Sequence, residues 1–383
     1  MITLLEIGLS LLILGSIVFY LASALVTLRF FNTQGNLQPA ASPSATPGVS
    51  ILVPVCGVDA GAWDNWTSLC TQDYPDYEVL FGVTDPADPA IPVLQKLVQQ
   101  FPDRASLYTD LKPRGINYKD SNLSYLLEAA RHDLIIFADS DIQVRPDYIQ
   151  IVTAPLADPT VGLVTCAFIA HNPQYLGAAI ASTGRCFDFI PSLLLAQVVD
   201  GGLRCAVGVT MATYRERLAK AGGLHMNRIG SDYNLGKRFA GAGYRVELSP
   251  YVLESDTGEE SITQVYQREL RWARTIRFNR GWQYYSMAFC YGTVYCLPLL
   301  LISNFAPWAI TLSLITLLVR LGQVFTAIAG MQAPGLLTWL WTLPLREAMT
   351  FVIWAIGSYG QGVYWRGRHL RVEGDGLITQ WEN

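Results

Sequence analysis

The sequence predicts an α/β domain with a mostly parallel sheet, flanked by membrane-spanning helices toward both ends of the chain. Two observations carry this prediction. Apolar runs without a charged residue occur at Ile7–Leu28 and at Gly281–Val319. Between them, from about residue 49 to residue 280, strand and helix signals alternate in a composition typical of a soluble domain. The whole chain of 383 residues averages these two parts, with 51% hydrophobic and 15% charged residues.

The first apolar run predicts an uncleaved membrane anchor over residues 4–28. A bilayer core about 30 Å thick needs about 20 helical residues to cross it. Ala22-Ser23-Ala24 resembles a signal-peptide cleavage site, but Glu6 stands where a signal peptide carries basic residues. Residues 29–48 are rich in Pro, Ser, Gly and Ala without periodicity, so they are expected to form a linker.

Residues 49–267 are expected to fold as the α/β domain. Strand patterns occur at Val49–Val55, Tyr77–Val83 and Asp133–Ala138, and helix patterns at Ala60–Thr71 and Pro89–Phe101. Repeated strand-then-helix units imply a mostly parallel sheet covered on both faces. Ligands of such sheets bind beyond the carboxyl ends of the strands, which is where functional residues are expected.

The last third of the chain is expected to return to the membrane. Residues 268–281 predict an interfacial helix, residues 282–365 a set of membrane helices, and residues 366–383 a tail. Candidate spans are Ser286–Ser303, Trp308–Ala329 and the shorter Ala348–Trp365, with Gly335–Leu345 too short to span. Arg320 inside the second span needs a partner in lipid, and Glu347 is the expected one.

Basic residues beside the apolar segments place the α/β domain on the cytoplasmic side of a membrane, as expected of a bacterial inner membrane. They stand at Arg29, at 268–280, and at Arg366, Arg368 and Arg371. Three spans after a cytoplasmic domain would leave the tail outside, so a hairpin or re-entrant turn is expected in the last apolar region. The net charge of −4 argues against a nucleic-acid partner. Seven cysteines without metal-ligand spacing are expected to be buried small hydrophobes.

Carboxylates follow two of the predicted strands. Asp85 follows the strand that ends at Val83, and Asp139-Ser140-Asp141 follows the strand that ends at Ala138. An Asp-x-Asp pair in this place suits Mg²⁺ or Mn²⁺, which prefer oxygen ligands and are completed by substrate phosphates. Such an ion would neutralise the charge that grows on a departing diphosphate. The alternative is a polar turn, since Asp and Ser are common turn residues.

Two further elements complete the set of candidate residues. Asp232, at the start of a predicted helix, is either a helix cap or a general base for an acceptor hydroxyl. Arg268, Arg271 and Trp272 combine guanidinium groups suited to phosphate oxygens with a flat ring suited to a sugar or lipid headgroup. The arginines continue at 274, 277 and 280, where contact with lipid phosphates is the expected role.

The order of these elements resembles the ceramide glucosyltransferase-like family of inverting transferases. The resemblance covers nearly all of the chain after the linker. It includes these stretches: Gly57-Val58-Asp59, Asp76-Tyr77-Glu78-Val79-Leu80, Asp88-Pro89-Ala90, Gly115-Ile116-Asn117-x-Lys119-x-x-Asn122-Leu123 and Trp365-Arg366. It implies a GT-A fold, a uridine contact at Asp85, a metal-diphosphate contact at Asp139 and a base at Asp232. It also implies diphosphate and acceptor contacts at Arg268, Arg271 and Trp272, and nucleotide-site roles for Asn117 and Lys119.

The chain departs from the animal ceramide enzymes at two places. They have Asp-Ser-Gly where this chain has Asp139-Ser140-Asp141, and a functional histidine in the stretch that here reads Phe187-Asp188-Phe189-Ile190-Pro191. Asp-Ser-Asp and the QRELRWART stretch look more like the bacterial branch associated with hopanoid biosynthesis. Phe187–Val199 is expected to pack at the bilayer surface and to guide the lipid, or else to be a buried helix of the domain core.

The resemblance therefore implies transfer of a hexose, glucose or N-acetylglucosamine, from a UDP-sugar to a membrane lipid with inversion to a β-linkage. A hopanoid polyol is the expected acceptor, and ceramide is the alternative. Two other classes remain open: a processive polysaccharide synthase, for which the apolar segments are too few, and a non-catalytic membrane protein that binds nucleotide sugars. The second would be expected to lack an acid or the Arg/Trp motif, and neither is missing.

Overall fold

The computed structural model describes residues 3–34, 46–365 and 367–381, and it divides into two compact units. The sheet unit comprises Gly35–Ala170, Val199–Glu259 and His369–Asn383. The helical unit comprises Met1–Gln34, His171–Val198 and Glu260–Arg368. Residues 35–45 of the expected linker and Arg366 of the expected tail lie outside the described residues.

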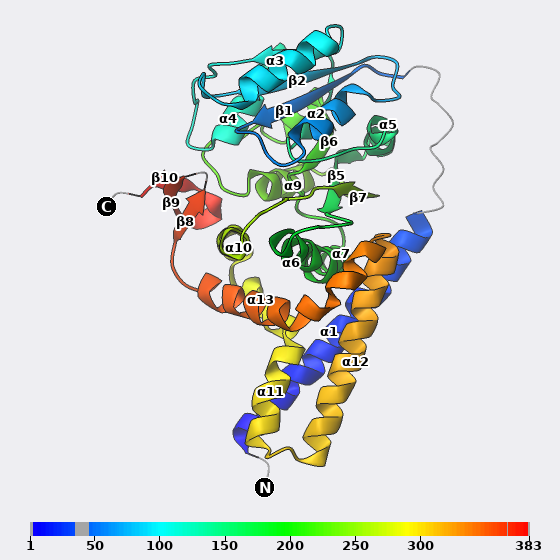
Figure 1. Ribbon diagram of the computed structural model, residues 1–383, viewed down its shortest axis with the longest axis vertical. Helices are drawn as coiled ribbons and strands as arrows, with labels where there is room; N and C mark the ends of the chain where they lie inside the picture. Colours follow the sequence, from blue (N-terminus) through cyan, green and yellow to red (C-terminus); the bar gives the residue numbers. More distant parts are fainter. Residues whose placement is uncertain (1–2, 35–45, 366, 382–383) are drawn as a thin grey trace. The chain divides into compact units, whose positions relative to one another are not determined.

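The sheet unit is built on a seven-stranded sheet in the order β3-β2-β1-β4-β6-β5-β7 (Figure 1). Its strands are β1 (Val49–Val55), β2 (Tyr77–Val83), β3 (Ala105–Tyr108), β4 (Leu134–Ala138), β5 (Val161–Ile169), β6 (Thr210–Tyr214) and β7 (Arg245–Glu254). Only β6 runs antiparallel to its neighbours β4 and β5, while β1 is parallel to both β2 and β4. The prediction of a mostly parallel sheet is confirmed.

The three strands beside the predicted site, β1, β2 and β4, form where the sequence is mostly apolar, with Ser50 and Glu78 as buried polar exceptions. β2 and β4 are buried at every residue, and β1 at every residue but Pro54. Long β-branched and aromatic runs of this kind suit strands that are covered on both faces. The predicted bounds of β1 and β2 are confirmed without change, and the predicted third strand differs from β4 only at Asp133, which lies outside β4.

The remaining elements of the sheet unit are mostly helices. They are α2 (Ala62–Cys70), α3 (Ala90–Gln100), α4 (Tyr118–Ala129), α5 (Tyr148–Thr153), η1 (Ala154–Ala157), α8 (Arg215–Lys220), α9 (Ser231–Gly241), β9 (Arg368–Val372), η5 (Gly374–Gly376) and β10 (Ile378–Gln380). The predicted helices Ala60–Thr71 and Pro89–Phe101 are confirmed, each shorter at both ends. β9 and β10 pair antiparallel, with Ile378 opposite Val372.

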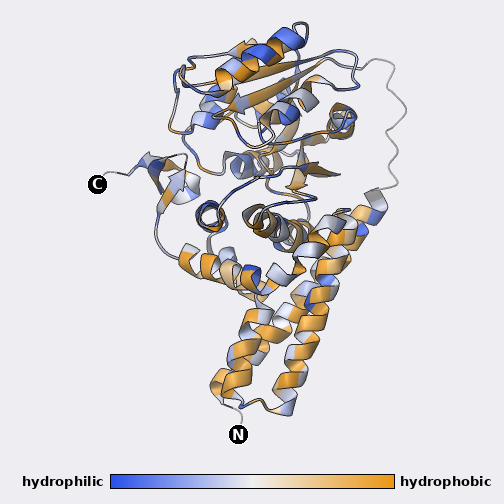
Figure 2. Ribbon diagram, in the orientation of Figure 1, coloured by the Kyte–Doolittle hydropathy of each residue, from blue (hydrophilic) through white to orange (hydrophobic). Residues whose placement is uncertain are grey.

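The helical unit contains the apolar segments. Its elements are α1 (Leu4–Gln34), α6 (Leu176–Gly184), η2 (Arg185–Phe189), α7 (Ile190–Val199), α10 (Ile262–Arg280), η3 (Gly281–Cys290), α11 (Gly292–Ile302), α12 (Pro307–Gly330), η4 (Pro334–Thr342), α13 (Leu343–Gly357) and β8 (Gly362–Trp365). α1 and α12 are each long and apolar enough to cross a membrane. Figure 2 shows apolar residues along both helices and along α11.

α1, α11 and α12 pack side by side around a shared apolar cluster (Figure 1). Ile13 of α1, Leu299 of α11 and Ala309 of α12 are fully buried in it. Gly292 allows this approach, because a Cβ there would lie 2.5 Å from the Ser16 Cβ and 3.2 Å from Thr316 Cγ2. The opposite faces of these helices expose large apolar side chains such as Leu11 and Leu318, which is the pattern expected of surfaces in contact with lipid.

After α10, one of the three predicted spans, Trp308–Ala329, corresponds to α12. The other two predicted spans have a different structure. In place of a straight span at Ser286–Ser303, the chain bends by 58° between Ile262–Cys290 and Gly292–Ile302. In place of a span at Ala348–Trp365, α13 ends at Gly357 and is 15 residues long, about 22 Å at 1.5 Å per residue. Figure 1 shows α13 lying transverse to α11 and α12. Pro344 and the polar pair Arg346-Glu347 stand near the start of this helix, which does not suit a segment surrounded by lipid.

Candidate active site

The carboxyl ends of β2 and β4 flank the end of β1, so the predicted acids lie on one edge of the sheet. Val55 of β1 is opposite Val83 of β2, and Leu52 of β1 is opposite Phe137 of β4. Asp85 follows β2, is exposed, and accepts a hydrogen bond from the Ala87 amide at 2.9 Å. Asp139 follows β4, and its amide donates to the Val209 carbonyl at 3.0 Å, which joins this end of β4 to the start of β6.

Lys119 of α4 reaches the carboxylate that follows β4. Its Nζ forms an ion pair with Asp139 and donates to the Gly208 carbonyl at 3.1 Å. Burial raises the pKa of Asp139, the Lys119 charge opposes that rise, and the neighbouring Asp141 adds to it. For Lys119, burial lowers the pKa, but the attraction of Asp139 and Asp232 outweighs burial and the pKa is raised. Lys119 therefore stays protonated and supplies a fixed positive charge among these carboxylates.

Asp232 joins the same group of charges from a different element. The N-cap of α9 is Gly230 in the left-handed conformation, without a side-chain capping bond. Asp232 lies in the first turn, close enough to Gly208 that a Cβ at Gly208 would lie 2.7 Å from Asp232 Oδ2. Asp232 is therefore not the N-cap of α9, contrary to the alternative interpretation, although a carboxylate in the first turn is favoured by the positive end of the helix dipole.

Asn117 acts as the N-cap of α4, the helix that carries Lys119. Its side chain accepts a hydrogen bond from the Asp120 amide at 3.2 Å and donates to Asp120 Oδ2 at 2.9 Å. The Asn117 amide donates to the Met226 carbonyl at 2.7 Å, and Nδ2 donates to the Arg228 carbonyl at 2.9 Å. Asn117 thus ties the start of α4 to the loop before α9.

Asp120 is a residue that the sequence analysis does not single out. It is buried, and burial raises the pKa of its carboxyl to about 7, with Lys119 opposing that rise and Asp232 adding to it. Perturbed carboxyl groups of this kind are common at active sites. Its position directly after Lys119 is the one sequence signal that points to it, and that signal does not distinguish it from an exposed residue of a helix turn.

The C-terminal hairpin of β9 and β10 supports the loop between α8 and α9. The Ile229 amide donates to the Gly376 carbonyl at 2.8 Å, and the Ile378 amide donates to the Asn227 carbonyl at 2.9 Å. Asp375 Oδ2 accepts from Arg228 Nη1 at 2.9 Å. Residues about 150 positions apart therefore hold one loop, which leads directly into Asp232. No local pattern in the sequence indicates this contact.

Asp139 and Asp141 are the residues that the sequence analysis assigns to a divalent cation. Their carboxylates repel each other, and Lys119 already supplies a positive charge to Asp139. Within residues 3–34, 46–365 and 367–381 there is no group of three or more His, Cys, Asp or Glu residues that could hold a metal. Two carboxylates are nevertheless the usual protein share of a Mg²⁺ site, whose other ligands are substrate phosphates and water.

Arg268, Arg271 and Trp272 lie on α10 in the helical unit. Arg268 Nη1 forms an ion pair with Glu260, and its guanidinium lies over the Trp272 ring at 5.5 Å. Nε and Nη2 of Arg268 are buried and have no hydrogen-bond partner in the described part of the chain. Arg271 lies over the Trp365 ring at 5.4 Å. Buried donors without acceptors are uncommon in native proteins, so Arg268 can accept an anionic ligand.

Arg274 and Arg277, which were expected to contact lipid phosphates, bind backbone carbonyl groups instead. Arg277 Nη1 donates to the Ser358 carbonyl at 2.8 Å, and its Nη2 donates to the Gly360 carbonyl. Arg274 donates to the Gly362 carbonyl. The chain turns after α13, where carbonyl groups have no helical partner, and the two guanidinium groups satisfy them.

The cysteines match the expectation of burial only in part, since Cys56 is exposed while five of the seven are buried.

The expected pair of Arg320 and Glu347 is confirmed, with Arg320 Nε donating to Glu347 Oε1 at 2.7 Å. The segment from Phe187 to Val199 belongs to the helical unit up to Val198, together with α1 and α12. Asp188 within it forms an ion pair with Arg320 at 2.5 Å. Its helix buries Leu193 and Leu194 and exposes Val198 and Val199.

Comparisons with known proteins give the chain a family. Residues 10–378 match the family described as glycosyl transferase family 21. Two relatives from Caenorhabditis elegans are ceramide glucosyltransferase 3, 27% identical over 60% of this chain, and ceramide glucosyltransferase 1, 26% identical over 70%. The chain spans 51% and 58% of their lengths.

A further relative is an N-acetylglucosaminyltransferase from Rhizobium leguminosarum bv. viciae, 24% identical over 87% of this chain and 76% of that protein. Among solved structures, a mannosyltransferase from Pyrobaculum calidifontis in complex with GDP-Man and Mn²⁺ is similar, with a TM-score of 0.53 and 16% identity. The likeness covers 92% of this chain and 99% of that one, and it supports a GT-A-like fold. The fold and the candidate membrane helices agree with the family match, and the chain belongs to glycosyl transferase family 21.

Proposed function

We propose that the protein transfers a hexose, glucose or N-acetylglucosamine, from a UDP-sugar to a hydroxyl group of a membrane lipid. The observation that carries this proposal is the group formed by Lys119, Asp139 and Asp232 beside the carboxyl edge of the sheet. It combines a carboxylate suited to a metal-diphosphate with a second carboxylate on another element that has no capping role. Proton removal and leaving-group stabilisation are thus assigned to separate residues.

In the proposed reaction, Asp232 accepts the proton of the acceptor hydroxyl as its oxygen attacks the anomeric carbon. The bond from that carbon to the diphosphate oxygen breaks, and UDP leaves with the electron pair. One displacement inverts the anomeric centre, so an α-linked donor gives a β-linked lipid. The catalytic acid-base work is done by one residue, because the departing diphosphate needs charge stabilisation rather than a proton.

The remaining candidate residues act on the donor. Asp85 contacts the uridine, while Asn117 and Lys119 belong to the nucleotide-sugar site. Asp139 and Asp141 would hold Mg²⁺ or Mn²⁺, whose positive charge stabilises the diphosphate. Arg268 donates from its two unpartnered nitrogens, Nε and Nη2, to phosphate oxygens, and Arg271 and Trp272 contact the diphosphate and the acceptor.

The lipid acceptor is proposed to be a hopanoid polyol, with ceramide as the alternative that the Caenorhabditis elegans relatives favour. The sheet unit is proposed to face the cytoplasm of a bacterial cell, on the basis of the basic residues that flank the apolar segments. The stretch Phe187–Pro191, which lacks the histidine that the animal enzymes carry there, supports an acceptor other than ceramide.

Purified full-length protein in detergent tests the proposal. It is incubated with UDP-glucose or UDP-N-acetylglucosamine against a hopanoid polyol, ceramide or diacylglycerol, and products are identified by mass spectrometry. A glycosylated lipid with release of UDP supports the proposal, and the pair that reacts fastest names donor and acceptor. Binding of UDP without transfer to any lipid would favour the non-catalytic alternative, and a growing polysaccharide would favour the processive synthase.

Removal of divalent cations tests the metal. Exhaustive dialysis against EDTA is expected to abolish transfer, and Mg²⁺ or Mn²⁺ is expected to restore it, because the carboxylates of Asp139 and Asp141 otherwise repel the diphosphate. The affinity for UDP is measured in the same samples and is expected to fall with the metal. Full turnover after chelation would remove the metal from the mechanism.

A further inference from the structure

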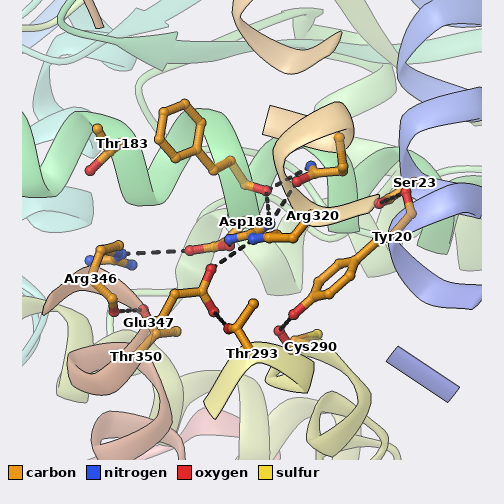
Figure 3. A network of polar contacts seen from close by, with 12 residues as sticks. Tyr20, Ser23, Thr183, Asp188, Cys290, Thr293, Arg320, Arg346, Glu347 and Thr350 are labelled. Carbon is orange, nitrogen blue, oxygen red and sulfur yellow. Dashed lines mark hydrogen bonds and ion pairs between the residues drawn. The ribbon is translucent and has the colours of Figure 1, made fainter. Parts of the chain in front are cut away.

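Five ionisable side chains form a largely buried network in the helical unit, outside the residues assigned to the reaction, and Figure 3 shows Asp188, Arg320, Arg346 and Glu347 of this network. This network consists of Asp188, Glu269, Arg320, Arg346 and Glu347. The side chains of Arg320 and Arg346 are 1% and 5% exposed. Burying charges is costly, and well-packed apolar residues of the same volume are often as stable or more stable. A contribution to stability therefore does not by itself explain why these five charged side chains are buried together.

One end of the network is built on a π-helical turn. η2 (Arg185–Phe189) interrupts the helix formed by α6 and α7, and a turn of this kind leaves a carbonyl without its usual partner. The Phe187 carbonyl accepts from Arg320 Nη1 at 3.2 Å and from Gln323 Nε2 at 2.9 Å. The same turn directs Asp188 to Arg320 Nη2 at 2.5 Å, and Figure 3 shows Asp188 between Arg320 and Arg346.

Arg346 of α13 joins this end to α10. Its Nη1 lies 2.7 Å from both carboxylate oxygens of Glu269, and its Nε lies 3.5 Å from Asp188 Oδ2. Gly184 makes room for this side chain, because a Cβ at that position would lie 2.1 Å from the Arg346 guanidinium carbon. The position of Arg346 is thus set from three sides, by α6, by the π-helical turn and by α10.

Glu269 stands inside the Arg/Trp motif, directly after Arg268 and two residues before Arg271. At 3.6 residues per turn, Arg268 and Trp272 share one face of α10, and Glu269 points about 100° away from Arg268. A fixed partner for Glu269 therefore fixes the rotation of α10 about its axis. α10 is also close to α13 at Gly357, where a Cβ would lie 3.0 Å from the Ala273 Cβ.

We propose that Arg346, held by Asp188 and paired with Glu269, is a positioning residue that sets the rotation of α10 and so aims Arg268 at the diphosphate. The inference rests on the proposed function of Arg268. It assigns a role in donor binding to residues that do not touch the donor. The network would fix the direction in which the two unpartnered nitrogens of Arg268 point. Loss of the pair lets α10 turn, and a misplacement of about 1 Å can lower turnover by about 10²-fold.

The test uses the full chain with both Glu269 and Arg346 replaced. Glu269→Gln alone would leave the buried charge of Arg346 without its carboxylate partner, which can prevent folding. The double variant Glu269→Gln/Arg346→Met removes both charges. It is expected to keep the thermal stability of the wild type and to lose about 10- to 100-fold in kcat/KM for the UDP-sugar, with weaker UDP binding. Arg320→Met/Glu347→Gln is the matched control, since neither residue has a hydrogen bond to α10 in the described part of the chain.

Arg346→Lys provides a second test if the double variant does not fold. It keeps the positive charge, but one ammonium group cannot replace both the Nη1 that contacts Glu269 and the Nε that lies near Asp188, so turnover and UDP affinity are expected to fall while the protein stays folded. A folded double variant or Arg346→Lys variant with wild-type UDP affinity and turnover overturns the inference, as does an equal loss in the Arg320→Met/Glu347→Gln control. Arg268→Gln separates the two proposals. If it leaves UDP affinity and turnover unchanged, the proposed role of Arg268 fails; if it lowers both while the double variant does not, only the positioning inference fails.

Discussion

Charges close to one another dominate the candidate site at the scale of single residues. The pKa values of Lys119, Asp120 and Asp139 are all raised, and the charge of Asp232 contributes to each of these shifts. The four residues come from α4, from the turn after β4 and from α9. Asp232 and Lys119 both lie against Gly208: a Cβ there would meet the Asp232 carboxylate, and the Gly208 carbonyl accepts a hydrogen bond from Lys119. Two residue-scale predictions follow from this arrangement, one for the proposed base and one for the buried acid.

Replacing Asp232 by Asn tests the base. The change keeps the shape of the side chain and removes its basicity, so turnover is expected to fall by about 10²- to 10⁴-fold with UDP affinity near the wild-type value. Turnover is measured with the reacting donor and lipid, and affinity by titration with UDP. Asp133→Asn in the same unit, at a carboxylate that is 88% exposed, is the control. Lost UDP binding would make Asp232 a nucleotide or metal ligand instead.

Asp120 is expected to make stability depend on pH. Its pKa is about 7 in the folded protein against 3.8 in an ordinary carboxyl group, so the folded state holds a proton that the unfolded state has released. This contribution is complete below pH 4 and is lost as the pH rises through 7, at a cost of up to about 4 kcal/mol. Asp120→Asn, which cannot ionise, should therefore gain thermal stability relative to the wild type between pH 5 and pH 8. A difference in melting temperature that stays constant over this range would rule out a buried titration at Asp120.

At the scale of elements, the C-terminal hairpin supports the loop that leads into α9. Ile378 of β10 is 1% exposed, and the hairpin accepts the Ile229 amide at Gly376. Ile378→Ala is expected to destabilise the hairpin by about 2–5 kcal/mol, the usual cost of such a truncation in a core. The Ile229 amide should then exchange with solvent faster, and turnover should fall because Asp232 follows three residues later, at the second position of α9.

Leu377→Ala is the matched control, because that neighbouring side chain is 38% exposed. Hydrogen exchange followed by mass spectrometry on peptides that contain residues 226–232 reports the loop directly. Unchanged exchange in the Ile378→Ala variant would mean that the loop holds its position without the hairpin.

At the scale of the whole molecule, the helical unit depends on close contact among α1, α11 and α12. Gly292→Ala is expected to lower the melting temperature in detergent, since an added Cβ meets Ser16 at 2.5 Å and overpacking costs about 1–3 kcal/mol. Gly322→Ala on α12 is the control. It meets nothing within 4 Å and is expected to be neutral or stabilising, because alanine favours a helix more than glycine does. Equal stability of the two variants would contradict the packing described for Gly292.

The α/β class, the strands β1, β2 and most of β4, and the apolar segments could be predicted from the sequence alone. These depend on local properties, since a run such as Val49–Val55 is buried wherever it stands, and a long uncharged segment suits lipid regardless of its neighbours. The pair of Arg320 and Glu347 was also predictable, because a charge among apolar residues needs a partner and few were available.

The partners of most polar residues could not be predicted from the sequence, because they depend on the tertiary structure. Glu269 reads as a spacer within the Arg/Trp motif, but its partner is Arg346, 77 positions away. Asp120, Asp375 and the turn-bonding arginines Arg274 and Arg277 likewise gain their roles from distant backbone and side chains. The physical reason is that a hydrogen bond or an ion pair depends on distances of about 3 Å, and the fold sets those distances.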